Sequence, residues 1–235
     1  MEDLALLTFT ARLLALVTAM AVATGAIAAT QKDLPKPAEV MFDRPHLKQV
    51  KSGDTLTYTL KREVSDTKLV APGFTDTITV KINSVDAEER KDLTVNVFTG
   101  ERARDPRDIS GMTGNPVLVF YLDRAVFGYA SVAGGKRAYL KNRFRIELRD
   151  TARIDPVKIK YKSGTVDGYR IKVIPYALDG NKAKMRGYTD SSFEIFLSDA
   201  IPGHFAEFRT DIKSTVEGSP SFVETLTLDG VEGLE

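Results

Sequence analysis

The chain has 235 residues, and its 33 Lys and Arg nearly balance its 32 Asp and Glu, giving a formal net charge of +1. This length is sufficient for one β-rich domain that buries a core of its own. The chain contains no cysteine, which excludes disulfide bonds, a lipid anchor on cysteine and cysteine-ligated metal sites.

The first 30 residues have the features of an export signal. Residues 13–29 are apolar and uncharged, Arg12 precedes them, and Ala26-Ile27-Ala28 has the small-x-small pattern that signal peptidase recognises. We therefore predict that residues 1–28 are a signal peptide cleaved near Ala28. An uncleaved membrane anchor is the alternative, although the run is short for a span. Export without cysteine is typical of a bacterial periplasm, where we expect the mature protein.

The region after the signal is predicted to be mainly strand. Residues 29–50 contain three prolines and are expected to form an extended arm. Residues 51–235 are expected to form a single β-rich domain. Its first strands are indicated by apolar residues that alternate with polar ones. They fall at Leu56, Tyr58 and Leu60, at Ile78, Val80 and Ile82, and at Leu93, Val95 and Val97. Residues 100–114 are polar and rich in glycine, which predicts a loop.

A helical insertion is predicted over about residues 116–150. Asn115-Pro116 can begin a helix, residues 117–133 are largely apolar, and Gly134-Gly135 can end it. A buried strand over residues 117–122 is the alternative, because the run is rich in β-branched and aromatic side chains. In residues 137–150, Leu140, Phe144 and Leu148 have helical spacing, whereas Phe144, Ile146 and Leu148 also alternate as in a strand. We predict an αα-hairpin.

The remaining segments again alternate like strands. Examples are Val157, Ile159 and Tyr161, then Tyr169, Ile171 and Val173, then Phe193, Ile195 and Leu197. The order of strands, two helices and strands predicts an α+β, mainly β fold. We expect a curved antiparallel sheet, a half-open barrel, with the inserted αα-hairpin against one face.

The two histidines, His46 and His204, do not by themselves indicate chemistry. His204 follows Pro202-Gly203 and is interpreted as a solvated residue at a strand corner, since no triad signature surrounds it. His46 and Asp43 are too few for a zinc site. No nucleotide-binding or nucleophile-elbow motif occurs. We therefore predict no catalytic residue, no metal and no cofactor.

The charge is unevenly distributed along the chain. The segment from Lys136 to Lys172 contains twelve Lys and Arg but only four Asp and Glu, which gives it a net charge of +8. Four of these cations are spaced by four residues and would form a basic stripe on the second helix: Arg137, Lys141, Arg145 and Arg149. Such a row attracts anionic surfaces, which in the periplasm are lipid head groups and not nucleic acid. A merely solvated helix face is the alternative.

The segments GNPVLVFYLDR, GGKRAYLKNRFRIEL and FEIFLSDAIPGHFAEFRT resemble a group of uncharacterised secreted alphaproteobacterial proteins over roughly residues 50–230. The expected architecture is also similar to periplasmic carriers of the lipoprotein-localisation-factor type. That similarity implies a half-open sheet that holds acyl chains under helices.

These observations favour a non-enzymatic periplasmic binding protein for a lipid or another amphipathic ligand. Its apolar groove would lie on the inner sheet face, with the anionic head of the ligand near the basic stripe. The groove residues are expected to be Leu56, Tyr58, Leu60, Tyr169, Ile171, Phe193 and Ile195. A dry core is the alternative for these side chains. Two other functions stay open: an envelope scaffold acting through protein contacts, and a hydrolase with a spatially assembled acid/base pair.

Overall fold

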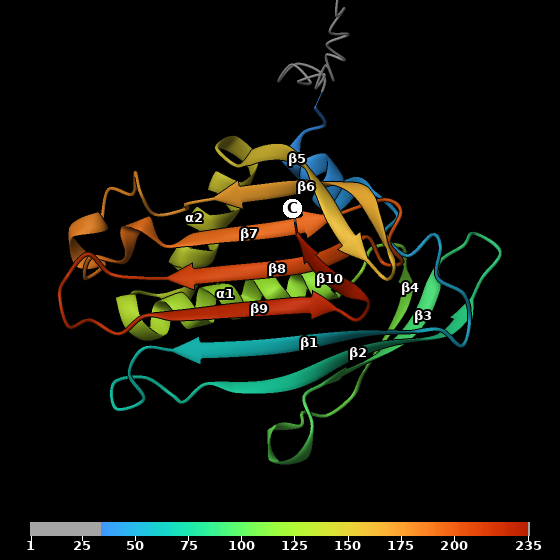
Figure 1. Ribbon diagram of the computed structural model, residues 1–235, viewed down its shortest axis with the longest axis horizontal. Coiled ribbons are helices and arrows are strands. Elements are labelled where there is room, and N and C mark those ends of the chain that lie inside the picture. Colours follow the sequence, from blue (N-terminus) through green and yellow to red (C-terminus); the bar gives the residue numbers. More distant parts are fainter. Residues whose placement is uncertain (1–33, 235) are drawn as a thin grey trace, which may run out of the picture. The chain divides into compact units, whose positions relative to one another are not determined.

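The computed structural model describes residues 34–234, so the predicted signal peptide lies outside the described residues. Within them, ten antiparallel strands form one sheet in the order β10-β5-β6-β7-β8-β9-β1-β2-β3-β4 (Figure 1). The strands are β1 Thr55–Val64, β2 Phe74–Val85, β3 Lys91–Val97, β4 Arg107–Met112, β5 Arg153–Tyr161, β6 Gly164–Val173, β7 Ser192–Leu197, β8 Phe205–Ile212, β9 Phe222–Leu228 and β10 Val231–Leu234. Because β10 and β4 are not paired with each other, the sheet is open, as the predicted half-open barrel requires.

Two helices, α1 (Val117–Ala133) and α2 (Arg137–Asp150), follow β4 and cover one face of the sheet. The predicted fold class and αα-hairpin are thus confirmed. Gly134 ends α1 with a positive φ of 79°, a conformation that glycine adopts without steric cost. The hairpin connects β4, at one edge of the sheet, with β5, beside the other edge. It therefore crosses the whole inner face.

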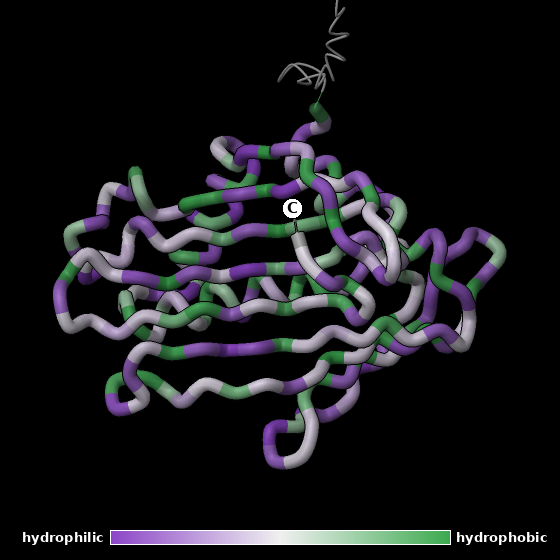
Figure 2. The backbone as a smooth tube through the Cα atoms, viewed as in Figure 1, coloured by the Kyte–Doolittle hydropathy of each residue, from purple (hydrophilic) through white to green (hydrophobic). Residues whose placement is uncertain are grey.

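The strands form where apolar and polar residues alternate, a pattern visible along the backbone in Figure 2. In β1, Leu56, Tyr58 and Leu60 are buried, while the threonines between them are partly exposed on the outer face. The register brings such residues together across the sheet. One continuous buried row consists of Ile154, Ile171, Ile195, Phe208, Leu226 and Leu60. The core therefore lies between this face and the helices.

The pairing of β1 with β9 joins segments that are distant in sequence. Leu60 lies opposite Leu226, and β9 also pairs with β8 on its other side. The first strand, β1, therefore lies beside β9 in the middle of the sheet. The edge strands are β4, which precedes the helices, and β10, which follows β9.

Two predictions about the local structure need correction. Part of the predicted loop over residues 100–114 forms strand β4, which pairs with β3 at the sheet edge. Its side chains are mostly exposed, so it lacks the apolar alternation by which strands are predicted. The predicted arm over residues 29–50 is also not extended throughout, because Glu39–Asp43 forms a π-helical turn, η1, with Val40 and Met41 buried.

No helix within residues 34–234 is sufficiently long and apolar to cross a membrane.

Candidate functional site

The seven side chains predicted to form an apolar groove all belong to β1, β6 and β7, but helix side chains cover them. Six are buried and Tyr169 is half-buried, and all pack with the helices into one core. For example, the rings of Phe144 on α2 and Phe193 on β7 meet edge to face with centroids 4.7 Å apart. The inner face is therefore packed at these positions.

A small cavity remains under α1, with a volume of about 10 Å³. Leu60 is the one member of the predicted groove that lines it, together with Phe120, Tyr121, Arg124 and residues of β9. A space of this size is comparable with a single water molecule and is too small for a ligand.

A buried ion cluster at this cavity holds α1 against the sheet. The carboxylate of Glu224, on β9, accepts hydrogen bonds from Arg124 on α1 at 2.7 and 2.8 Å. Arg62 on β1 donates to the same carboxylate at 2.5 Å, and its guanidinium lies 3.8 Å from the centre of the Phe222 ring. All three charged side chains are largely buried, with 8%, 17% and 9% exposure for Glu224, Arg124 and Arg62. Sequence reasoning missed this cluster because its members are far apart in the chain.

The four cations of the predicted basic stripe have different surroundings. Lys141 forms an ion pair with Asp123 of α1, and Arg149 forms one with Asp150. That second contact lowers the pKa of the Asp150 carboxyl. Arg137 lies over the ring of Phe127 at 5.5 Å. Arg145 forms no hydrogen bond or ion pair with any residue in the described part of the chain.

Arg145 and Arg149 line a second cavity, of about 270 Å³, between α2 and the π-helical turn η1. Its remaining lining residues are Ala38, Phe42, Asn142, Ile146 and Leu148. Phe42, Ile146 and Leu148 give it an apolar wall, while Asn142 and the two arginines are polar. An amphipathic anion matches both parts of this lining.

Local structure explains why Phe42 faces this cavity. Val40 and Met41 point into the core from η1, and the wider π-helical turn leaves Phe42 51% exposed. Arg44 follows and donates to both oxygens of Asp199, at 2.8 and 2.6 Å, which fixes the turn to the corner between β7 and β8. Phe42 was not predicted as a site residue, although the apolar triplet Val40-Met41-Phe42 in a proline-rich segment was a signal for a packed turn.

The same corner brings the two histidines together. His204 lies at the predicted corner between β7 and β8 with a positive φ of 62°, but it is only 7% exposed and not solvated as predicted. Its ring centroid is 5.4 Å from that of His46, whose Nε2 donates to the carbonyl of Val40. Burial lowers the pKa of both imidazoles, although the Asp199 carboxylate, 3.4 Å from His204, acts in the opposite direction. Within residues 34–234, no hydroxyl group is hydrogen-bonded to either ring, so the pair does not form a nucleophile–base arrangement there.

No group of three or more His, Asp and Glu side chains suited to a metal ion occurs within the described residues.

No protein-family model matches the chain, and no curated protein matches it. Among solved structures, it is similar to the lipoprotein LppX of Mycobacterium tuberculosis, with 11% identity over 86% of this chain and 99% of that one and a TM-score of 0.34. It is also similar to a LolA superfamily protein of Nitrosomonas europaea, with 9% identity over 84% of this chain and 93% of that one and a TM-score of 0.20. We therefore base the proposed function on the contacts within this chain.

Proposed function

We propose that this chain is a non-enzymatic binding protein for an amphipathic anion such as a fatty acid. The apolar part of the ligand lies against Phe42, Ile146 and Leu148, and its charged end contacts Arg145 and Arg149. The observation that carries this proposal is the cavity of about 270 Å³ that combines this wall with two guanidinium groups. Its volume is near the lower end for small-molecule sites, which suits one short acyl chain.

The charges at the cavity favour an anionic head group. Guanidinium groups bind carboxylates and phosphates through paired N–H donors. Arg145 has no partner among the described residues, so it can bind an anion without first losing another contact. Arg149 is 69% exposed and, within residues 34–234, is paired only with its neighbour Asp150, which is 46% exposed. Such an exposed ion pair has low stability, so a ligand can replace it.

The outer cavity is also a more accessible site than the inner sheet face. Binding an acyl chain on the inner face would require the helices to leave the core, and moving α1 would separate Arg124 from Glu224. Separating such a buried pair costs about 3–5 kcal/mol. The cavity at Phe42 is open without this change. We therefore place the ligand outside the seven residues of the predicted groove.

The proposed location is the periplasm, supported by the apolar run and the cleavage pattern before Ala28. Lipids and their hydrolysis products are the amphipathic anions of that compartment.

Displacement of a small fluorescent anion tests the proposal. We expect 1-anilinonaphthalene-8-sulfonate to bind, octanoate to displace it, and uncharged octanol to displace it much less. Arg145→Gln is expected to weaken binding about tenfold, since a hydrogen bond to a charged group contributes roughly 1.5–3 kcal/mol. Phe42→Ala should weaken it about fivefold through lost apolar contact.

Two control variants have matched chemistry outside the cavity. Arg107→Gln removes an exposed cation of β4, and Phe127→Ala removes a ring of α1 that is 55% exposed, close to the 51% of Phe42. Both should bind the probe as the unaltered protein does. Equal affinity in the cavity variants and their controls would show that the ligand does not bind here.

A further inference from the structure

The loop between β6 and β7, residues 174–191, carries an apolar side chain fully in the solvent. Leu178 is 85% exposed, although leucine is among the residues most often buried. The loop contacts the hairpin near the turn between α1 and α2, where Arg186 donates to the carbonyl of Val132 at 3.3 Å. Figure 1 shows the loop and this end of the hairpin at the same end of the sheet.

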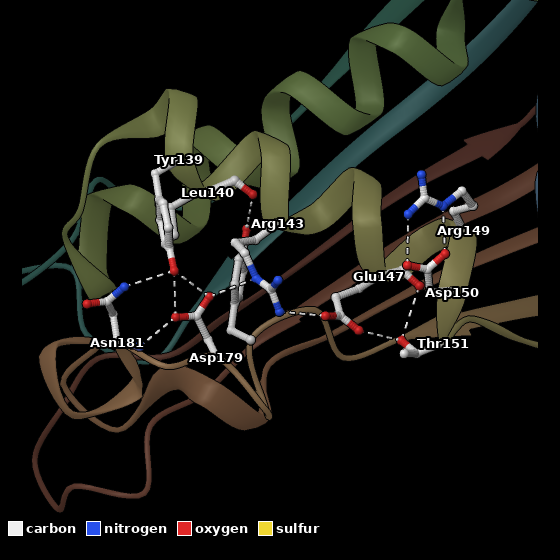
Figure 3. A network of polar contacts seen from close by, with 10 residues as sticks. Tyr139, Leu140, Arg143, Glu147, Arg149, Asp150, Thr151, Asp179 and Asn181 are labelled. Carbon is white, nitrogen blue, oxygen red and sulfur yellow. Dashed lines mark hydrogen bonds and ion pairs between the residues drawn. The ribbon is translucent and has the colours of Figure 1, made fainter.

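A buried carboxylate fixes the tip of this loop (Figure 3). Asp179 has a fully buried side chain and accepts hydrogen bonds from the Tyr139 hydroxyl at 2.7 Å, from Arg143 Nε at 3.0 Å and from the backbone N–H of Asn181 at 2.7 Å. Tyr139 and Arg143 belong to α2. Since Asp179 is thus bound to the helix, the adjacent Leu178 is presented to solvent by an ordered tip.

Cations follow this tip in the sequence and also stand at the start of α2, the helix that contacts Asp179. Lys182 and Lys184 form the exposed single turn η3, Lys182–Lys184, directly after it, and Lys136 and Arg137 begin α2. None of these four side chains forms an ion pair with a carboxylate in the part of the chain that the structure describes. Arg137 instead lies over Phe127, which is 55% exposed. The surface therefore combines two exposed apolar side chains with four cations that have no carboxylate partner within residues 34–234.

We propose that this surface, which we name the Leu178 face, docks on an anionic lipid bilayer. It consists of Leu178, Phe127, Lys136, Arg137, Lys182 and Lys184. Apolar side chains that enter the head-group region, flanked by Lys and Arg, are the chemistry of interfacial membrane binding. Excess positive charge favours anionic lipid over a neutral protein surface. The Leu178 face shares no residue with the cavity at Phe42, so membrane docking can be tested independently of ligand binding.

A fluorophore at the tip tests docking directly. Because the chain has no cysteine, Leu178→Cys in the full chain can be labelled selectively with nitrobenzoxadiazole. We expect a blue shift and increased emission with phosphatidylglycerol vesicles, no change with phosphatidylcholine vesicles, and loss of the shift in high salt. The control is a label at Val85→Cys, an apolar side chain 39% exposed where β2 ends at the other end of the sheet, which should stay in water.

Charge variants complete the test. Each Lys near an anionic surface contributes about fivefold to the partition coefficient, so Lys182→Gln with Lys184→Gln should lower vesicle binding at least tenfold. Lys51→Gln with Lys81→Gln, exposed cations near the start of β1 at the other end of the sheet, should not. An unshifted label at position 178, or equal binding by both double variants, would overturn the proposal. A blue shift that increases with protein concentration without vesicles would instead identify a second copy as the partner.

Discussion

The ion cluster of Arg62, Arg124 and Glu224 offers the most informative test of how the hairpin is held. Glu224→Gln removes the one carboxylate that both arginines contact while preserving the size of the side chain. Two guanidinium groups, 9% and 17% exposed, then face each other without a counter-charge. Breaking a buried ion pair in this way costs about 3–5 kcal/mol.

We expect a loss near the lower end of that range, about 3 kcal/mol, because aromatic rings still contact both arginines. Arg62 keeps Phe222 at 3.8 Å, and Arg124 keeps Phe74 and Phe98 at 5.4 and 5.5 Å. With a urea dependence of about 2 kcal/mol per molar, the unfolding midpoint should fall by about 1.5 M.

Two further variants make the result decisive. Glu63→Gln, on the same strand as Arg62, removes an exposed carboxylate paired with Lys61 and should cost less than about 1 kcal/mol. Replacing all three cluster residues with Met, Leu and Met should restore stability to within about 1 kcal/mol, since apolar residues tolerate burial. If Glu224→Gln lowers the midpoint no more than Glu63→Gln does, the cluster does not hold α1 against the sheet.

Two further predictions concern the corner between β7 and β8. Burial lowers the pKa of His46 and His204 below 6.5. Below about pH 6.5 the unfolded chain therefore binds more protons than the folded chain. The free energy of unfolding should consequently fall as the pH falls through that range. His204→Asn, which also tolerates the positive φ, should flatten this dependence in urea titrations at about pH 5 and about pH 7.5, and an unchanged slope would contradict the assignment. Gly203→Ala would place its Cβ 2.5 Å from Leu56 Cδ1, whereas Gly218→Ala has a similar φ and open space. We expect losses of about 3 and about 1 kcal/mol respectively in thermal unfolding, and equal losses would refute the steric account.

Alternating apolar residues were sufficient to predict the central strands and the side of the sheet that is buried. Leu56, Tyr58 and Leu60 face the core as predicted, because a strand with one buried face must alternate. Both ends of α1 were also predictable, since Asn115-Pro116 and Gly134-Gly135 favour a helix start and a helix stop. Strand β4 was not, because an exposed edge strand buries too little apolar surface to leave a pattern.

The candidate site was predictable only in part. Arg145 and Arg149 were identified from their helical spacing. The same spacing could not show that Lys141 forms an ion pair with Asp123 of another helix. Phe42 and Ile146 meet through the packing of η1 against α2, which depends on contacts between distant parts of the chain. The packing of the seven predicted groove residues under the helices was not predictable for a related reason. A strand pattern shows which face is apolar, but not whether a helix fills it.

The pairing of β1 with β9 also affects how the chain is made. Arg62 and Glu224 are 162 positions apart, so β1 leaves the ribosome long before the strand beside it exists. We infer that the nascent polypeptide cannot complete its sheet until β9 has been synthesised, because contacts between such distant residues form late. Until then β1 can pair only with β2, and its other edge exposes backbone N–H and C=O groups that lack the partners they have in the finished sheet.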